Sequence, residues 1–569
     1  MSKKEVVLHI RDLKDMLNQT KELYKNKPAY KIKDENKKYK IITHKEVRDM
    51  IDALGTALTT LGLQGKRIGI IGENRYEWEI SYLAVVCGVG TVVPFDKSLP
   101  ENELKRLIER SEVEAIIYSE KYEGALKKFV LEETGNLKRL ISMDSKTHKN
   151  GIYSWSELIE FGEVLLKNGN RAFLDSKINA EEMQIMLFTS GTTSESKVVA
   201  LCHRNLCTNL MDIATMLDVN SDDRFLSFLP IHHVFECTVG FLLALYRGAQ
   251  TSFCDGIRHM QENYKEYKIT FAACVPAIFE NMYKNVWKKL EKDGKKEETL
   301  ELLEKFKDAS MEKRRKVFKN VHEMFGGHIK TFISGAAAID KNVAKGYRDF
   351  GINLLQGYGL TETSPVVATE TEEFNRVGSI GKCYPSLDVK IEEPNEEGVG
   401  ELLVKGPTVM LEYYNNEDAT KEAIVDGWFH TGDLAKIDED GFIFIMGRKK
   451  SVIVLKNGKN IFPEEMETLI NRIEGVKESF IFGKSNKKDK EDDIRVHAKI
   501  VYDKDIMKLA YKAETEEEIH KAIFDRIKDL NETMPAYKGI KGIVLSEKPL
   551  IKTTTNKIKR QEEIKTIEQ

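Results

Sequence analysis

Short apolar segments alternate with amphipathic segments through the first half of this 569-residue chain, and this alternation constrains the fold more than any other feature. Apolar residues three and four apart predict helices, whereas short apolar runs bounded by turn residues predict strands. Strands separated by helices of about ten residues form βαβ units, which build a parallel sheet. We expect helices at 45–61, 76–86, 101–110 and within 283–324, and strands at 67–71, 91–93, 115–118, 223–229, 251–253, 269–275, 330–333 and 352–355.

The pattern changes near residue 388. Segments 388–406 and 435–447 each predict a hairpin, the second turning at Asp440-Gly441. After Gly447, a short strand, a helix that begins at Pro463, two further strands and a helix at 517–530 predict a separate α+β unit. The expected fold class is α/β. A large N-terminal domain (1–447) would hold parallel-sheet subdomains and a β-rich part (388–447), followed by a small mobile α+β C-terminal domain (448–569).

Composition narrows the classes of function. The net charge is −3, so no overall field attracts nucleic acid, and we expect at most peripheral contact with a membrane. The seven cysteines show no CxxC pair and no partner His spacing, which favours free thiols in a reducing compartment over disulfides or zinc. The N-terminus carries no long apolar run. A cytoplasmic location is expected.

A hydroxyl-rich loop follows the apolar segment 185–188. Six of the eight residues from Thr189 to Ser196 carry a hydroxyl, and the run ends on Lys197. Gly191 lets the backbone approach a ligand closely, hydroxyls and amide N–H groups donate to phosphate oxygens, and an ammonium balances charge. The loop is not a Walker motif, which needs a glycine at 196 and a hydroxyl at 198. A flexible Ser/Thr-rich linker has the same composition. The motifs further along the chain therefore decide between a phosphate-binding loop and a linker.

Those motifs follow one another in the order of a known enzyme family. They are LPIHHVFE (229–236), VPAIFE (275–280), SGAAAI (334–339), QGYGLTETSP (356–365), WFHTGDL (428–434), GRKK (447–450) and KTTTNKIKR (552–560). With the loop at 188–197 they resemble the AMP-forming acyl and aryl adenylating enzymes, which include acyl-CoA synthetases, luciferases and peptide-synthetase adenylation domains. The resemblance covers almost the whole chain, and its details are similar to the bacterial long-chain fatty acid–CoA ligases.

This resemblance implies a two-step reaction with ATP, a fatty acid and CoA, assisted by Mg2+. The carboxylate attacks the α-phosphate of ATP to give acyl-AMP and pyrophosphate, and a thiol then displaces AMP. The first step brings two anions together, so it depends on positioning and charge neutralisation.

The resemblance also implies roles for residues around the nucleotide. Glu362 would hold Mg2+, beside Thr361 at the α-phosphate. Tyr358 would stack on adenine, Asp433 would accept both ribose hydroxyls, and Arg448 would assist. The β- and γ-phosphates would be wrapped by Thr189, Ser190, Gly191, Thr192, Thr193 and Lys197. The adenine side would be completed by Gly335, Ala336, Gln356 and Gly357.

Five further residues receive roles in the same way. His233 would border the acyl carboxylate, and Lys557 would reach the reacting oxygens in the first step only. Gly359 stands where acetate-activating relatives carry a tryptophan, which implies an open pocket for a longer acyl chain. Lys450 would be the hinge, and the turn around Gly458 would face the pantetheine. Outside this context, each residue also fits an ordinary structural role.

The chain departs from the family pattern at several positions. Glycine, proline and glycine are usual where this chain has Ser194, Ser196 and Val198, and glycine is usual where Asn556 precedes Lys557. Val does not tolerate φ > 0, so these departures bear on ATP affinity. Two alternatives stay open: a nucleotide-binding relative without ligase activity, and a ligase that loads an acyl carrier protein in place of CoA.

Overall fold

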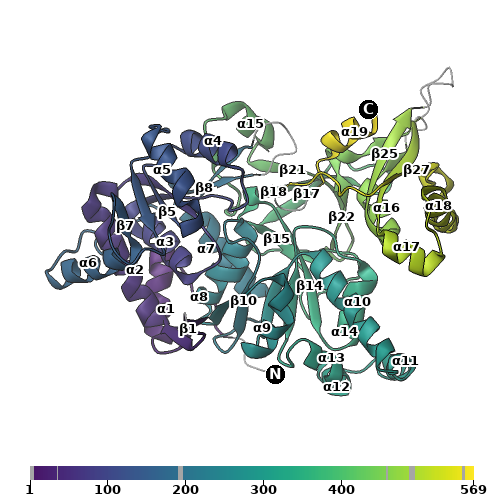
Figure 1. Cartoon of the computed structure of the whole chain (residues 1–569), viewed down its shortest axis with the longest axis horizontal. Coiled ribbons are helices and arrows are strands. Elements are labelled where there is room, and N and C mark those ends of the chain that lie inside the picture. The colour runs from purple at the N-terminus through teal and green to yellow at the C-terminus, as the bar shows by residue number, and fades with distance from the viewer. Residues whose placement is uncertain are drawn as a thin grey trace.

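The computed structural model describes residues 5–34, 36–189, 196–455, 459–485, 494–553 and 558–568. Two large sheets with flanking helices lie side by side, and a smaller unit from the C-terminal part of the chain stands at one end (Figure 1). The architecture is α/β, as the alternation of strand and helix signals predicted.

The first large sheet has eight strands in the order β19-β9-β8-β4-β3-β5-β6-β7. Its strands from β8 to β7 are parallel, whereas β9 is antiparallel to β8 and to β19. The strands are β3 (Lys66–Ile71), β4 (Gly90–Pro94), β5 (Ala115–Tyr118), β6 (Arg139–Ser142), β7 (Ile152–Ser154), β8 (Met183–Phe188), β9 (Val198–Cys202) and β19 (Glu412–Tyr413). The associated helices are α1 (Leu13–Tyr24), α2 (His44–Leu58), α3 (Tyr76–Ala84), α4 (Glu101–Ser111), α5 (Glu123–Leu131), α6 (Trp155–Lys167) and α7 (His203–Met216).

The second large sheet has nine strands in the order β16-β15-β14-β13-β12-β10-β11-β1-β2. Its central strands are parallel and its ends are antiparallel. The strands are β1 (Pro28–Lys33), β2 (Tyr39–Thr43), β10 (Arg224–Ser227), β11 (Gln250–Phe253), β12 (Phe271–Cys274), β13 (Thr331–Ser334), β14 (Asn353–Gly359), β15 (Val366–Thr369) and β16 (Lys382–Cys383). The helices in this part are α8 (Leu243–Tyr246), α9 (Met260–Glu266), α10 (Pro276–Lys292), α11 (Lys296–Lys305), α12 (Met311–Val317), α13 (Lys319–Met324) and α14 (Lys341–Asp349).

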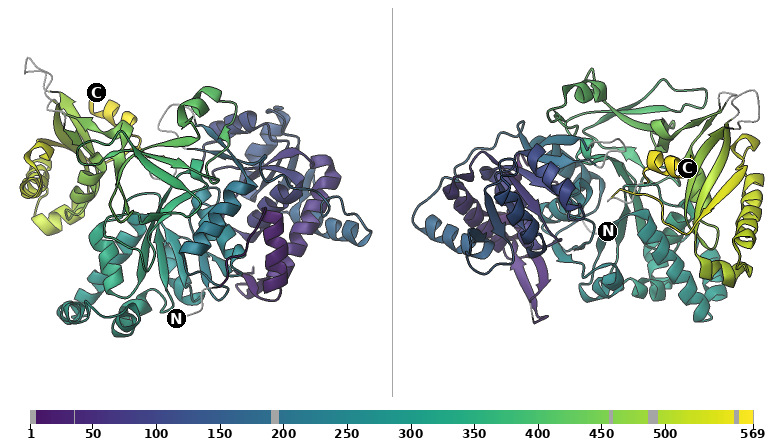
Figure 2. Two further views of the ribbon diagram at one scale, coloured as in Figure 1. Left: turned by 180° about the vertical axis from the view of Figure 1, so that it is seen from behind. Right: turned by 45° about the horizontal axis from the view of Figure 1, so that its top comes forward.

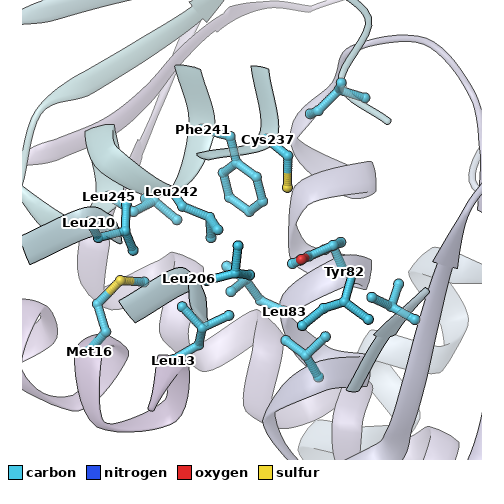
Figure 3. Close-up of a cluster of buried hydrophobic side chains, with 14 of the residues drawn as sticks. Leu13, Met16, Tyr82, Leu83, Leu206, Leu210, Cys237, Phe241, Leu242 and Leu245 are labelled. Atoms are coloured by element: carbon cyan, nitrogen blue, oxygen red, sulfur yellow. The ribbon is translucent and has the colours of Figure 1, made fainter. Parts of the chain in front are cut away.

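One continuous core joins the two sheets. Figure 3 shows apolar side chains of α1, α3, α7 and the π-helical segment η4 (Glu236–Leu242) meeting in its centre. Tyr82, Leu206, Phe241 and Leu242 are almost fully buried there. Burial of a side chain of this size contributes roughly 1.5–3 kcal/mol, so this cluster ties the two sheets into one body.

A smaller sheet follows the second large one. It consists of β17 (Asp388–Glu392), β18 (Gly400–Lys405), β20 (Ile424–Val425), β21 (Trp428–Ile437) and β22 (Ile443–Arg448), which confirms both predicted hairpins. The same stretch of chain also leaves this sheet. After β18 it crosses to the first large sheet, where β19 pairs with β9, and it returns through α15 (Glu417–Ala423). Turn residues alone could not predict this exchange, because it depends on which sheet edge is within reach.

The C-terminal unit has its own apolar core, which contains Ile461, Met466, Ile500 and Ile523. In both further views it lies at one end of the molecule, outside the two large sheets (Figure 2). Its elements are β23 (Ile453–Val454), β24 (Asn460–Ile461), β25 (Val476–Ser485), β26 (Ile494–Tyr502), β27 (Gly542–Ser546), α16 (Pro463–Ile470), α17 (Lys504–Tyr511), α18 (Glu516–Glu532) and α19 (Arg560–Glu568).

Most predicted elements exist, with ends displaced by a few residues. Several elements had not been predicted, among them the hairpin of β1 and β2 and the helices α1, α5, α6, α7 and α14. Within the described residues, every helix is either too short or too polar to span a bilayer.

Candidate active site

Tyr358, Asp433 and Arg448 form one hydrogen-bonded group. The Tyr358 hydroxyl donates to Asp433 Oδ2 at 2.6 Å, and Arg448 Nε lies 2.9 Å from Asp433 Oδ1. Asp433 is almost fully buried, while Arg448 stays partly exposed. Burial, and then the carboxylate of Asp433, raises the pKa of Tyr358, which keeps its hydroxyl a donor. The structure thus brings together three residues that the sequence separates by up to ninety positions.

The strand pairing explains this meeting. Asp433 on β21 is the cross-strand partner of Arg448 on β22, and directly opposed residues of antiparallel strands lie close enough to pair. Tyr358 comes from β14 in the neighbouring large sheet. The carboxylate of Asp433 offers acceptors for a vicinal diol, beside the aromatic ring of Tyr358.

Glu362, Tyr413 and Lys197 form a second group. β14 runs into the single turn η6 (Thr361–Thr363), which carries Thr361 and Glu362. The Tyr413 hydroxyl donates to Glu362 Oε1 at 2.8 Å, and Lys197 Nζ lies 4.3 Å from the centre of the Tyr413 ring. A carboxylate and an ammonium therefore face the same region, four residues along the chain from Tyr358.

The two ends of the hydroxyl-rich loop are held together. The Thr189 amide donates to the Lys197 carbonyl at 2.9 Å, continuing the ladder of β8 and β9. Val198 begins β9 opposite Phe188, so its backbone is extended, a conformation that a β-branched residue favours. The departure at Val198 therefore causes no strain. Ser190, Gly191, Thr192, Thr193 and Ser194 lie outside the described residues.

Segment 229–236 packs against the turn that carries Gly335 and Ala336. A Cβ added at Gly335 would lie 2.8 Å from the Phe235 ring, so only glycine allows this contact. Ala336 adopts φ of +70° and is exposed at the turn. The rings of His232 and His233 lie 4.1 Å apart, and His232 Nε2 is 3.4 Å from Asp96 Oδ1. His232 is thus buried beside a carboxylate, while His233 is half-buried.

Gln356, Gly357 and Gly359 lie on β14 with different local roles. The Gln356 side-chain amide donates to the Ser379 carbonyl at 3.0 Å, which makes it part of the sheet's own support. A Cβ at Gly357 would meet only ordinary van der Waals contacts. A Cβ at Gly359 would lie 1.9 Å from the Pro365 carbonyl oxygen, so the turn into β15 itself requires glycine there. The acyl-pocket role of Gly359 stays a prediction.

The segment between the last β-rich strand and the C-terminal unit is short and exposed. Lys449 and Lys450 form a single turn, η7 (Lys449–Ser451). Lys449 Nζ lies 2.8 Å from Glu401 Oε2, and this hydrogen bond raises the pKa of Lys449. The hinge role of Lys450 stays a prediction. Gly458, Asn556 and Lys557 lie outside the described residues.

Tyr413 is the site residue that sequence reasoning missed. It belongs to none of the motifs, and its strand is only two residues long. In the sequence Tyr413 stands out only as part of the pair Tyr413-Tyr414. The surrounding segment has no apolar alternation, so this pair predicts neither a strand nor a site.

Comparison with known proteins agrees with this geometry. The family model for the AMP-binding enzymes matches residues 17–414, and the model for the C-terminal domain of AMP-binding enzymes matches residues 450–569. Long chain acyl-CoA synthetase 3 of Arabidopsis thaliana is 29% identical over 486 residues, covering 79% of this chain and 72% of that protein. The long-chain-fatty-acid–CoA ligase FadD15 of Mycobacterium bovis is 29% identical over 449 residues, covering 75% of this chain and 72% of the ligase.

Solved structures share the fold. The anthranilate CoA ligase AuaEII in complex with anthranoyl-AMP superposes with a TM-score of 0.77 at 18% identity, covering 98% of both chains. ATP-bound MatB from Rhodopseudomonas palustris gives a TM-score of 0.73 at 22% identity, covering 97% of this chain and 98% of MatB. The likeness extends over both the large sheets and the C-terminal unit. The chain therefore belongs to the AMP-binding enzyme family, as the order of its motifs predicted.

Proposed function

We propose that the protein is an ATP-dependent fatty acid–CoA ligase that works through an acyl-AMP intermediate. The observation that carries this proposal is that two groups of side chains lie next to each other. One is built around Tyr358 on β14, and the other around Glu362 on the turn that follows this strand. Tyr358 with Asp433 and Arg448 suits an adenosine, and Glu362 with Lys197 suits a polyphosphate and its metal. Glu362 follows Tyr358 by only four positions, so both groups can contact one nucleotide.

The first group fits adenosine chemically. Asp433 offers a buried carboxylate, which can accept from both hydroxyls of a ribose. Arg448 neutralises its charge, and the Tyr358 ring provides a surface for a base. In this proposal Gly335 and Ala336 border the base, where the lack of bulky side chains leaves room for it.

The second group fits a magnesium polyphosphate. Glu362 supplies a hard carboxylate oxygen of the kind Mg2+ prefers, and Thr361 adds a hydroxyl beside it. When bound, the metal would neutralise phosphate charge and hold the polyphosphate in line. Lys197 would add a second positive charge, and Lys557 a third in the first step. His233 would border the carboxylate of the acid.

Chain length and acceptor are the finer parts of the proposal. Both relatives described above are named as ligases of long-chain acids and CoA, which supports a long acid and CoA as substrates here. A carrier protein presents the same phosphopantetheine thiol as CoA, so the experiment must include both acceptors.

The experiment supplies ATP, Mg2+ and an equimolar mixture of fatty acids, with CoA and an acyl carrier protein in the same reaction. Mass spectrometry of the products should find acyl-CoA of medium or long chains, with one pyrophosphate released per thioester. Asp433→Asn, which keeps the shape but removes the charge, should lose most of this activity. Pyrophosphate release without a thioester on either acceptor would contradict the ligase, and acyl-carrier product alone would replace CoA as the acceptor.

A further inference from the structure

Tyr413 connects two segments that carry the phosphate end of the site. Its strand β19 is the edge of the first large sheet, where Tyr413 is the partner of Val199 on β9. Lys197 lies two residues before Val199, and Glu362 lies on the turn after β14 of the other large sheet. Tyr413 is thus placed at the junction of the two sheets, although it comes from the β-rich part of the sequence.

Both functional side chains contact Tyr413. Its hydroxyl donates to Glu362 Oε1 at 2.8 Å, and its ring faces Lys197 Nζ at 4.3 Å. A hydrogen bond to a carboxylate is about twice as strong as one between neutral groups, and an ammonium over an aromatic ring gains further electrostatic attraction. Each contact restricts the rotamers of a charged side chain.

The ring itself is well anchored. Tyr413 is only 5% exposed, and its amide donates to Thr420 Oγ1 of α15 at 3.0 Å. The amide of nearby Met410 donates to the Glu362 carbonyl at 2.8 Å, so this crossing segment also holds the backbone of the turn. The support therefore reaches Glu362 at both its main chain and its side chain.

We propose that Tyr413 is a positioning residue, whose hydroxyl orients Glu362 toward Mg2+ and whose ring supports Lys197 toward the phosphates of ATP. This inference rests on the proposed function, since it concerns the same site. Because one oxygen of Glu362 accepts from the phenol, the other is left to face a metal.

Two variants separate the hydroxyl from the ring. Tyr413→Phe removes only the hydroxyl, and Tyr413→Leu removes the hydroxyl and the aromatic face. Tyr414→Phe is the matched control, because the neighbouring hydroxyl accepts from Arg67 Nη2 at 2.6 Å and takes no part in the site. ATP binding is measured by calorimetry without fatty acid, over a series of Mg2+ concentrations, and thermal unfolding checks that every variant is folded.

Tyr413→Phe should raise the Mg2+ concentration for half-maximal ATP binding by about tenfold, while ATP affinity at saturating Mg2+ stays near that of the wild type. Tyr413→Leu should also weaken ATP binding at saturating Mg2+ by about three- to fivefold. Thioester formation from supplied acyl-AMP should be unchanged in both variants. Tyr414→Phe should match the wild type throughout.

An unchanged Mg2+ requirement in Tyr413→Phe would overturn the role of the hydroxyl, and equal ATP affinities of the Phe and Leu variants would overturn the role of the ring. The proposed function fails separately, if the wild type binds ATP with Mg2+ but forms no acyl-AMP from any fatty acid.

Discussion

Arg472 of the C-terminal unit donates to Asp340 of the large part of the molecule, with Arg472 Nε 2.5 Å from Asp340 Oδ2. Asp340 also caps α14 by accepting from the Asn342 amide, and its own amide donates to Glu280 at 3.1 Å. Burial raises the pKa of Glu280, which accepts this hydrogen bond from Asp340. The ion pair therefore links the orientation of the C-terminal unit to a rigid helix start.

The first prediction concerns this ion pair. The C-terminal unit is expected to turn between the two half-reactions. Arg472→Gln should then destabilise the orientation in which Arg472 pairs with Asp340. The ratio of the two half-reaction rates should change a fewfold, because a partly exposed ion pair contributes about 0.2–1 kcal/mol. Arg472→Lys should keep most of the effect of the charge. Lys477→Gln is the control, because Lys477 pairs with Asp503 inside the C-terminal unit. Equal changes in both half-reactions would show that Arg472 does not select an orientation.

The second prediction concerns Lys557, whose role follows from the family resemblance. Lys557→Ala should lower the rate of acyl-AMP formation by several orders of magnitude, because a cation is lost from the reacting oxygens. Thioester formation from supplied acyl-AMP should survive. Lys559→Ala tests a nearby lysine that pairs with Glu562, and should leave both rates near those of the wild type. Similar losses in both half-reactions of Lys557→Ala would contradict the assignment.

The third prediction concerns the hinge at Lys450. Proline fixes φ near −65°, so Lys450→Pro should form acyl-AMP and stall before the thioester. Lys450→Ala retains the freedom of both dihedral angles and should turn over normally. Rapid-quench measurement of acyl-AMP and thioester distinguishes the two steps. Normal turnover of the proline variant would place the pivot elsewhere.

The fourth prediction concerns chain length and Gly359. The wild type should prefer a medium or long fatty acid to acetate in kcat/KM by orders of magnitude, since each buried methylene adds about 0.8 kcal/mol. A Cβ at Gly359 would meet the Pro365 carbonyl, so Gly359→Ala should lower kcat/KM for both acids alike. Gly359→Trp should in addition remove the preference. Should alanine alone remove it, the preference depends on the turn and not on the pocket floor.

The fifth prediction concerns pH and the buried Glu236. Burial raises the pKa of Glu236 from its ordinary 4.5 to about 7, although the Ser227 hydroxyl donates to it at 2.7 Å. The folded chain then keeps a proton that the unfolded chain has lost, so the free energy of unfolding should fall by roughly 3 kcal/mol as pH rises through this window. Glu236→Gln carries no such proton and should show a flatter dependence.

Thermal unfolding between about pH 5 and 7.5 measures this difference. The exposed Glu301 of α11 provides the control, since Glu301→Gln should leave the wild-type slope unchanged. A wild-type slope in Glu236→Gln would assign the pH dependence to another group, such as the neighbouring buried Glu79, whose pKa burial also raises.

The periodicity of the sequence determined the α/β class, the parallel sheets and the hairpins of the β-rich part, because these depend on apolar spacing and turn residues within a few positions. The pairing of Asp433 with Arg448 could be predicted in part from the same local pattern, because one hairpin carries both residues. Tertiary structure decided what lies far apart along the chain. Tyr413 reaches Glu362 and Lys197 because β19 adds to β9, and Arg472 reaches Asp340 because the C-terminal unit packs beside α14. Such contacts are set by which faces and edges pack together, and the local pattern at either residue contains no information about its distant partner.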